Sequence, residues 1–502
     1  MNKIKKFLIF KFLVLAKYFR STLSESEGMY KLLFLPGYEK TRWRVGKWKA
    51  WLVFENAKRT VPAYKDFLQK NGQTEIPIHG WEPDLTVIKP MDKESYIKKY
   101  SIEERCRNGK IPATGVVVDE SSGTSGTPNN WVRGKNERDA VKYALQTALH
   151  FLVGKKPIFF INAFALGPWA TGMNVSMSFV DVSILKSVGP DVKKIEDTLN
   201  LFGPKYHYII SGYPPFLKAL VDSSKVDWAK YDIIIIYGGE GMSEGMRKYL
   251  GKSSKQIYGS YGASDLEINI ATENDFTIAL RKTLVSNKQL YDKIVKHGTL
   301  PMVFQYNPLD YYIESNEQGE LLVTLCRKSN VAPKVRYNIH DLGHVLRFPE
   351  FKKIISELGL NISDIGNAQS DLPLLFHYGR SDMAVGFYGC KITPGEIEDI
   401  IFNNSNLTKQ VNSFSLITTE DEKMNKLLIL ALEMNEGEQP LKDLDKINKE
   451  IFESLKTINQ DYKESSKMIP AGLEPKLEVY SFGEGPFAIN DIRLKKNYIQ
   501  QR

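Results

Sequence analysis

Cysteine is scarce in this 502-residue chain, and its spacing excludes the common cysteine-built sites. The three cysteines, Cys106, Cys326 and Cys390, lie far apart and form no CxxC pair. An odd number of widely spaced cysteines predicts neither a disulfide framework nor a structural zinc site. We therefore predict no zinc, and a protein of a reducing compartment, the cytoplasm.

The sequence also lacks an apolar run long enough to cross a membrane. Residues 1–20 combine six basic residues with Ile, Leu, Val and Phe, but Lys11 interrupts the apolar run, and no small-residue cleavage site follows. Two interpretations stay open. The segment is either an interfacial helix in peripheral contact with the inner membrane face, or a lead-in helix packed on the body with its lysines solvated.

A strong excess of one charge is also absent, since the net charge is only +9. With no zinc finger and no aromatic RNA-binding signature, we predict no nucleic-acid partner. Hydrophobic residues make up 42% and charged residues 25% of the chain, which is typical of a globular protein that buries a large core in two or more domains. The sequence shows no internal repeat or low-complexity tract.

Apolar segments that end in glycine or polar residues predict buried strands alternating with helices. These segments are "KPIFFINAF", "YHYIISGY", "YDIIIIYGGE" and "KQIYGSYG". Residues 233–236 are four consecutive isoleucines without alternation, which predicts a strand covered on both faces. The sequence therefore favours an α/β fold whose strands end at a functional edge.

The pattern changes after Gly379. "GEIEDIIFNN" predicts a helix, "VNSFSLITTEDEKMNKLLILALEM" predicts two strands about an acidic turn, and apolar residues at spacings of 3, 4 and 4 from Leu444 predict another helix. We therefore expect three parts: a lead-in over residues 1–50, a large multi-sheet α/β domain over 51–380, and a small α+β domain over 381–502.

One loop, "SSGTSGTP", consists of small hydroxylated residues and glycines. Its hydroxyls offer hydrogen-bond donors, and its glycines let the backbone approach a ligand closely, so the loop suits an anion. Its candidate residues are Ser121, Ser122, Gly123, Thr124, Ser125, Gly126 and Thr127.

Four further motifs follow this loop in order: "GGEGMS", "YGASD", "RYNIHDLG" and "GRSDMAVGFYGCKITPGEIE". Together the five resemble the adenylate-forming superfamily of acyl-CoA synthetases, peptide-synthetase adenylation domains and luciferases. The phenylacetate-CoA ligase branch is the most similar, and "ENAKRTVPAYKDFL" and "NAFALGPWATG" add to that likeness. The resemblance runs from about Glu55 to the C-terminus.

The resemblance implies that a carboxylate reacts with magnesium-ATP to give an acyl-adenylate and pyrophosphate, and that a thiol then releases AMP. The implied cofactors are ATP, Mg²⁺ and coenzyme A, with the phosphopantetheine of an acyl carrier protein as the alternative acceptor. The implied partner is a small-molecule carboxylic acid, whose identity the sequence does not reveal. Such chemistry needs groups that hold the phosphates and aim the carboxylate at phosphorus.

The motifs also imply roles in nucleotide binding. The hydroxylated loop would close on the β and γ phosphates, and Asn129 stands where many relatives carry lysine, so Arg133 or Lys135 would supply charge there. The adenine, ribose and α-phosphate would be contacted by Gly238, Gly239, Glu240, Tyr261, Gly262, Ser264, Asp341 and Arg380.

Two positions depart from the family pattern. Asp265 stands where relatives carry the glutamate that binds magnesium, and oxygen ligation of a hard cation still permits an aspartate. His340 replaces the glycine usual before Asp341, so the backbone is expected to differ there. We interpret His340 as a structural or surface imidazole.

The remaining candidates concern the acyl pocket and the lid. Substrate-binding candidates are Asn162, Phe164, Trp169 and Tyr213. By resemblance, residues 381–502 form a small mobile lid with Asp382 as its hinge, while Gly389 and Lys391 enter the thiol-accepting pose. The catalytic lysine of relatives aligns with Arg493, with Lys495 as the alternative. Two other functions stay open: an adenylyl transferase whose product keeps AMP, and a degenerate nucleotide-binding module.

Overall fold

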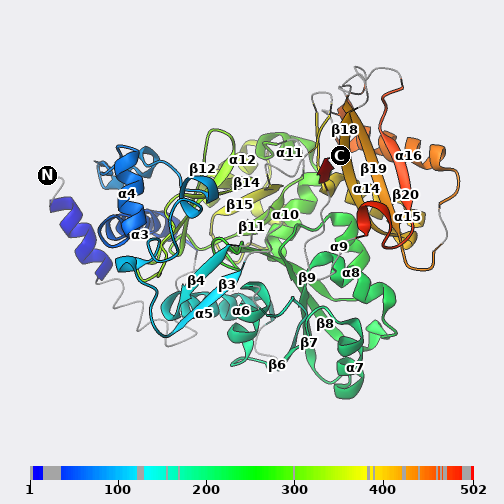
Figure 1. The fold of residues 1–502 in the computed structure, drawn as a ribbon, viewed down its shortest axis with the longest axis horizontal. Coiled ribbons are helices and arrows are strands. Elements are labelled where there is room, and N and C mark those ends of the chain that lie inside the picture. Colours follow the sequence, from blue (N-terminus) through cyan, green and yellow to red (C-terminus); the bar gives the residue numbers. More distant parts are fainter. Residues whose placement is uncertain are drawn as a thin grey trace.

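The computed structural model is built around one large twisted sheet (Figure 1). The structure describes residues 4–14, 36–120, 129–153, 157–167, 170–297, 300–380, 385–387, 390–420, 426–438, 441–459, 462–463, 466, 472–488 and 499–501. Eleven strands form this sheet, in the order β12-β13-β14-β15-β11-β10-β9-β8-β7-β5-β6.

One half of the sheet is parallel. It consists of β6 (Ile184–Ser187), β5 (Ile158–Asn162), β7 (His207–Gly212), β8 (Asp232–Gly238) and β9 (Gln256–Tyr261). The last four coincide with the four apolar segments of the sequence, so the prediction of an α/β fold is confirmed. Because parallel strands end at the same edge, Gly238 and Tyr261 lie at one rim of the sheet.

The other half is antiparallel. It consists of β10 (Ala271–Thr272), β11 (Met302–Gln305), β15 (Leu374–Arg380), β14 (Tyr337–Leu346), β13 (Glu320–Leu325) and β12 (Tyr311–Ser315). Across β14 and β15, Asp341 stands opposite Arg380. A separate pair, β3 (Val116–Glu120) and β4 (Asn130–Gly134), flanks the hydroxylated loop.

Helices cover both faces of the parallel half. On one face lie α5 (Lys135–Val153) and α6 (Ala170–Phe179), and on the other lie α7 (Val192–Phe202), α8 (Pro214–Ser223) and α9 (Glu244–Leu250). Ile234 packs in the first core, whereas Ile233 and Ile235 pack in the second. The isoleucine run is therefore covered on both faces, as its lack of alternation predicts.

The remaining helices of the large body pack against the antiparallel half or the N-terminal end. They are α3 (Glu39–Thr60), α4 (Pro62–Lys70), α10 (Asp275–Ser286), α11 (Lys288–Ile294), α12 (Phe348–Glu357) and α13 (Ile362–Ile365), and β1 (Ile78–His79) pairs with β2 (Glu82–Pro83) beside α3.

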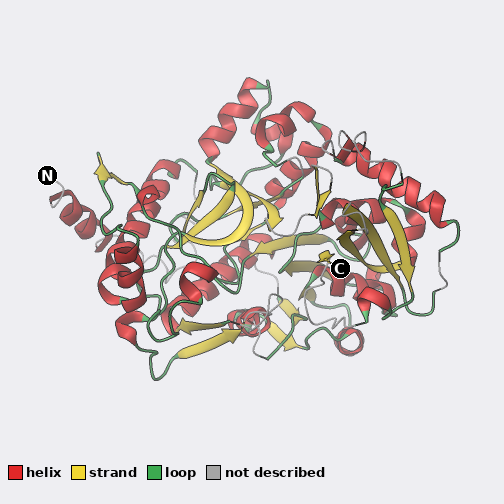
Figure 2. Ribbon diagram, turned by 45° about the horizontal axis from the view of Figure 1, so that its top comes forward, coloured by secondary structure: helices red, strands yellow, loops and turns green. Residues whose placement is uncertain are grey.

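A second hydrophobic core lies toward the C-terminus, apart from the large sheet (Figure 2). Its four strands run in the order β20 (Lys476–Tyr480), β19 (Lys426–Met434), β18 (Val411–Glu420) and β21 (Ile499–Gln501). Around them pack α14 (Pro394–Asn403), α15 (Ser405–Gln410), α16 (Leu444–Ile458) and the pair β16 (Val385–Phe387) and β17 (Cys390–Ile392). The two helices and two strands predicted for this region are confirmed.

Residues 4–14 form a helix at the N-terminal end of the molecule. Ile9 and Leu13 are buried in the core that contains α3 and α4, and Lys6 pairs with Glu55 and Glu75 on the body. In the described part of the chain, no helix is both long and apolar enough to span a bilayer.

Candidate functional site

The turn after β8 depends on a residue without a side chain. Gly239 has a φ of +88°, a left-handed conformation that glycine adopts at little cost. A Cβ at this position would lie 2.2 Å from Cε1 of Tyr213, the residue that precedes α8. Gly239 and the Tyr213 ring are therefore in direct contact, and the glycine motif shapes the wall that the ring forms.

The loop after β9 is held by a buried arginine. Arg133 on β4 donates hydrogen bonds to the carbonyl oxygens of Ser264 and Leu266. Its Nε also lies 3.4 Å from the buried carboxylate of Asp119. The expectation that Arg133 supplies charge to phosphates does not match these contacts, because the guanidinium binds carbonyl oxygens of the loop itself. Lys135, the alternative, pairs with Asp139 at 2.8 Å on an exposed helix surface.

Tyr261 and Asp341 meet although 80 positions separate them. The Tyr261 hydroxyl donates to Oδ2 of Asp341 at 2.6 Å, and Nε2 of His377 lies 3.3 Å from the same oxygen. Burial by itself would raise the pKa of Asp341, but His377, Tyr261 and Arg380 outweigh it and hold this pKa below its ordinary value. The carboxylate is therefore kept ionised and can accept hydrogen bonds.

His340 has a backbone conformation that glycine adopts more readily. Its φ is +64°, in the left-handed region that residues with a Cβ adopt at a cost. The backbone N–H donates to Oδ1 of Asn338 at 2.7 Å, and ring Nδ1 lies 3.0 Å from Glu320. These contacts stabilise the strained angle, and the ring is a surface imidazole as interpreted.

Asp265 is buried among donors. Its Oδ2 accepts a hydrogen bond from the Tyr337 hydroxyl at 2.9 Å, and Nζ of Lys93 lies 3.4 Å from the same oxygen. Among the described residues, none donates to Oδ1. One carboxylate oxygen therefore remains for a hard cation, so the site fits magnesium, although a resident ammonium stands beside it. Lys93 gave no signal in the sequence, because it lies outside every motif.

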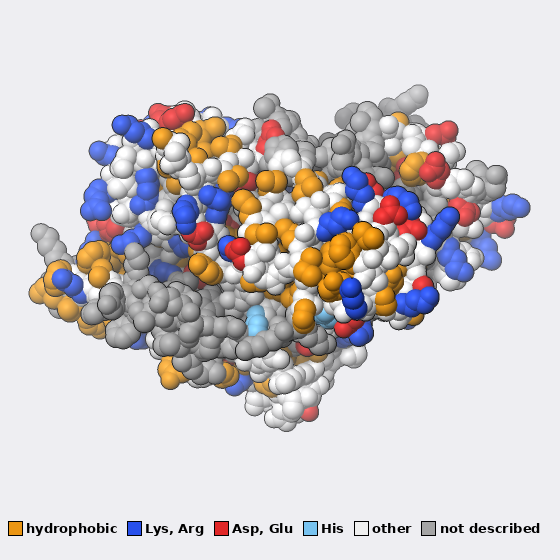
Figure 3. Space-filling view, turned by 90° about the horizontal axis from the view of Figure 1, so that it is seen from below, with side chains coloured by type: hydrophobic (Ala, Val, Ile, Leu, Met, Phe, Trp, Pro, Cys, Tyr) orange, Lys and Arg blue, Asp and Glu red, His pale blue; other side chains and the backbone are white. Residues whose placement is uncertain are grey.

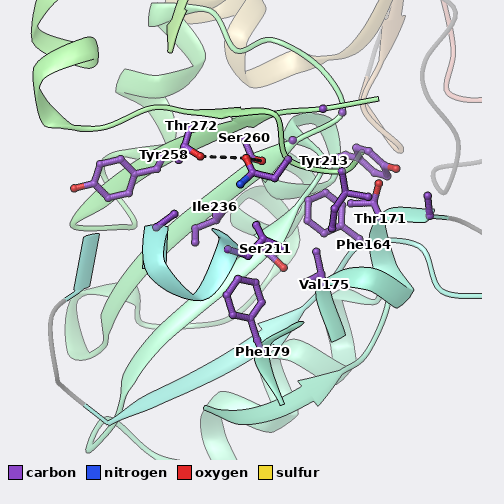
Figure 4. A pocket seen from close by; sticks show the side chains of 18 of the residues that line it. Phe164, Thr171, Val175, Phe179, Ser211, Tyr213, Ile236, Tyr258, Ser260 and Thr272 are labelled. Carbon is purple, nitrogen blue, oxygen red and sulfur yellow. Dashed lines mark hydrogen bonds between the residues drawn. The ribbon is translucent and has the colours of Figure 1, made fainter. Parts of the chain in front are cut away.

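A cavity of about 140 Å³ lies between the large sheet and the helices α5 and α6 (Figure 4). Gly238, Gly239, Gly262 and Ser264 line it where β8 and β9 end. The strand ends form the polar rim of the cavity. The helices α5 and α6 form the apolar wall of its interior. The cavity therefore places the "GGEGMS" and "YGASD" motifs on one continuous space.

The acyl-pocket candidates divide around this cavity. Phe164 and Tyr213 line it, with ring centroids 5.1 Å apart in an edge-to-face contact, and both labels lie on one side of the pocket in Figure 4. Asn162 is fully buried and does not line the cavity; its amide donates to Gly172 and Ser176 and so anchors α6. Trp169 lies outside the described residues.

Several other predicted site residues also lie outside the part of the chain that the structure describes. They are Ser121 to Thr127, Asp382, Gly389, Arg493 and Lys495. Lys391 belongs to β17, and Glu240 follows the turn at Gly239. Within the described ranges, no group of three or more histidines, cysteines and carboxylates is placed to hold a metal ion.

Solved structures share this architecture. 2-Hydroxyisobutyryl-CoA ligase in complex with 2-HIB-AMP, in the postadenylation state, matches with a TM-score of 0.65 over 93% of this chain and 91% of that chain, at 13% identity. The same ligase in an open conformation with 2-HIB-AMP and CoA matches with a TM-score of 0.53, over 93% of both chains at 13% identity. No family model and no curated protein sequence matches this chain. The chain therefore has the fold of the adenylate-forming acyl-CoA ligases.

Proposed function

We propose that this protein is an AMP-forming ligase that joins a carboxylic acid to a thiol. ATP and the acid give an acyl-adenylate and pyrophosphate, and the thiol then attacks the acyl carbon and releases AMP. We place the reaction in the cytoplasm, and we assign the chain to the phenylacetate-CoA ligase-like branch on its motifs.

The observation that carries this proposal is the cavity whose rim is made by the ends of β8 and β9. At that rim, the glycine turn at Gly239 and Ser264 meet a pocket large enough for an organic acid. Beside it, Tyr261 and Asp341 are joined by a hydrogen bond, and Arg380 stands opposite Asp341. This supports the proposal, because transfer from a carboxylate to phosphorus requires groups for the nucleotide and for the acid close to each other.

Asp265 is our proposed magnesium ligand, through Oδ1. A bound Mg²⁺ would neutralise charge on the phosphates and so help pyrophosphate to leave. The remaining residues bind and orient: Ser264 toward the α-phosphate, Asp341 toward the ribose, and the hydroxylated loop of residues 121–127 toward the β and γ phosphates.

For the second step we propose that residues 381–502 act as a lid, hinged at Asp382, that brings Gly389 and Lys391 to the site. Arg493, or Lys495, would serve the first step in the same lid. The acceptor is coenzyme A or the phosphopantetheine arm of a carrier protein, both of which present the same thiol.

The test is ATP–pyrophosphate exchange over a panel of acids, followed by release of AMP on adding a thiol. Acid-dependent exchange and thiol-dependent AMP release are expected. Exchange with AMP retained in the product would instead indicate an adenylyl transferase, and nucleotide binding without exchange a degenerate module. Coenzyme A and a phosphopantetheinylated carrier protein are compared as acceptors in parallel assays.

We also propose that the N-terminal helix, residues 4–14, rests on an anionic lipid surface. Ile4, Phe7, Leu8, Phe10, Phe12 and Val14 are exposed on it, and Figure 3 shows apolar and basic side chains together at this end of the molecule. Lys6, by contrast, is turned toward carboxylates of the body. Ile9 and Leu13 hold the helix on the body, and the exposed apolar side chains are those that would enter a lipid surface.

Sedimentation with anionic vesicles tests the membrane proposal. The full chain should sediment with phosphatidylserine-containing vesicles, and the double variant Phe7→Ser, Leu8→Ser should remain in the supernatant with unchanged exchange activity. Leu201→Ser, which removes an exposed leucine elsewhere, is the matched control and should still sediment. Equal sedimentation of all three proteins would remove the proposal.

A further inference from the structure

The interior of the cavity is nearly free of charge. Of the described residues that line it, Glu120 alone has a charged side chain, and it stands at the end of β3. No lysine, arginine or histidine lines the cavity in the described ranges. A second carboxylate on the substrate would therefore be buried there without a cationic partner among the described residues, at a high cost in free energy.

The wall on the helix side is made of large apolar side chains. Leu145, Leu149 and Leu152 recur on one face of α5, and Val175 and Phe179 lie on α6. Three of these, Leu149, Val175 and Phe179, belong to the same buried core as Phe160 of the sheet. The cavity is thus a gap within a hydrophobic core. An apolar group that fills it is removed from water and packs against the core side chains, and both effects favour binding.

Phe179 closes the cavity on the side opposite the polar rim. Its ring stacks on Phe160, with centroids 4.5 Å apart and an interplanar angle of 18°. In Figure 4, Phe179 lies across the pocket from Ser260 and Thr272. A group that enters from the Ser264 end therefore meets the Phe179 ring when it reaches full depth.

Resting on the proposed function, we propose that the substrate is a monocarboxylic acid with an uncharged, apolar tail of about six to eight carbon atoms, and that Phe179 sets the length of that tail. An apolar cavity of about 150 Å³ holds a benzene-sized molecule, so a cavity of about 140 Å³ holds a tail of this size. The carboxylate stays at the rim beside Ser264, and the tail lies between α5, α6 and the sheet.

The experiment compares acids in ATP–pyrophosphate exchange by the full-length protein. From butanoate to octanoate, kcat/KM should rise about fourfold for each methylene, the gain expected from burying one such group. Hexanedioate, which has the length of hexanoate and a second carboxylate, should be poorer than hexanoate by at least about 100-fold. Phenylacetate, whose ring matches the cavity volume, should also support exchange.

Variants on α6 test the depth. Phe179→Ala should move the optimum to longer acids, and Val175→Phe, which fills the same cavity, should move it to shorter ones. Val182→Ala changes an exposed residue outside the cavity and should keep the wild-type optimum. Thermal unfolding of each variant confirms that the protein is folded, and the opposite shifts of the first two keep the test valid if one variant does not fold.

The outcomes separate the two proposals. If no acid in the panel supports exchange, the proposed function fails. If exchange occurs but hexanedioate or short hydroxy acids are preferred, the function stands and the inference about the tail is overturned. An unchanged optimum in both folded α6 variants would overturn the role of Phe179.

Discussion

Gly239 shows how one backbone angle shapes the wall of the cavity. A side chain there would be strained by the φ of +88° and would also strike the Tyr213 ring. Gly437 has a similar φ of +82°, but a Cβ would meet no atom within 4 Å. Substitution of the two glycines therefore distinguishes the effect of backbone strain, which both positions share, from the effect of contact with Tyr213, which concerns Gly239.

Gly239→Ala should lower the free energy of unfolding by about 1–2 kcal/mol and raise the KM for the acid about tenfold, since Tyr213 must move. Gly437→Ala should lose similar stability with an unchanged KM. Thermal unfolding and exchange kinetics measure the two effects. Equal KM values in both variants would mean that the Tyr213 wall does not contact the acid.

Asp265 and Lys93 allow a test of the metal assignment in which two variants shift in opposite directions. If Mg²⁺ and the Lys93 ammonium compete for the Asp265 carboxylate, Lys93→Gln should lower the Mg²⁺ concentration that gives half-maximal exchange. Asp265→Asn should raise it and slow exchange about 10- to 100-fold, because a neutral amide is a poorer ligand for a hard cation. Magnesium titrations of both variants and the wild type provide the measurement.

Asp227→Asn is the control, because that carboxylate is exposed and pairs only with Lys230 near it in sequence. Its Mg²⁺ titration should match the wild type. Shifts in the same direction for the Lys93 and Asp265 variants would contradict competition at this carboxylate.

Some residues of the candidate site can be predicted from the local sequence, and others cannot. Gly238 and Gly239 follow an apolar run directly, so a local pattern places them at a strand end. The hydrogen bond between Tyr261 and Asp341 is different, because it depends on β9 and β14 being folded into one sheet. The same holds for the leucines of α5, whose spacing is that of any core helix and gives no sign of a cavity beside them.

At the scale of elements, the parallel strands were predictable and the antiparallel half was not. The strands β5, β7, β8 and β9 are long apolar runs that end in glycine or polar residues, whereas β10 has only two residues. The pairing of β14 with β15 brings Asp341 opposite Arg380 through register, which no local pattern encodes. The motif order predicts candidate residues, and the sheet supplies the arrangement of those that the structure describes.

The contact between α9 and α14 joins the large body to the C-terminal core. Oε2 of Glu398 accepts a hydrogen bond from the N–H of Ser243 at 3.2 Å, and Oδ1 of Asp399 accepts one from the N–H of Gly245 at 3.2 Å. Two carboxylates of α14 thus cap the start of α9, directly after the "GGEGMS" turn. Burial raises the pKa of Glu398 to about 8.

This raised pKa predicts a pH dependence of stability. Between pH 4.5, the ordinary pKa, and about 8, the folded protein holds a proton on Glu398 that the unfolded chain has lost. The free energy of unfolding therefore falls as pH rises through this window. Glu398→Gln cannot ionise, so its melting temperature should rise relative to the wild type between pH 5 and pH 8.

Glu453→Gln, at an exposed site on α16, is the control and should show the same change of stability with pH as the wild type between pH 5 and pH 8, where this carboxylate is ionised in both states. Asp399 and Glu396, whose pKa values are also raised by burial, titrate in all three proteins, so the difference isolates Glu398. Parallel melting curves for Glu398→Gln and the wild type would contradict the assignment.

At the scale of the whole molecule, the hydrophobic core that contains residues of the "GGEGMS" and "YGASD" motifs is separate from the C-terminal core. The contact between α9 and α14 directly follows the glycine turn at the rim of the cavity. A change in the position of the C-terminal core would therefore affect the groups that would hold adenine. A two-step reaction needs different groups at the site in each step, and a small second core can supply them in turn.

Arg493→Ala tests whether different groups of the C-terminal part act in the two steps. If Arg493 bridges the carboxylate and the phosphate in the first step alone, the variant should form acyl-adenylate ~10- to 1000-fold more slowly, the effect of one or two lost charge-assisted contacts. A supplied acyl-adenylate should still be converted to thioester at the wild-type rate. Lys391→Ala should show the reverse pattern, with normal exchange and slow thioester formation.

Two further variants decide which cation acts. Arg493→Lys should recover part of the lost exchange, because it keeps the charge but not the planar fork of the guanidinium. Lys495→Ala should leave exchange intact. If Lys495→Ala abolishes exchange while Arg493→Ala does not, the alignment of the tail is shifted by two residues, and Lys495 is the cation that reaches the phosphate.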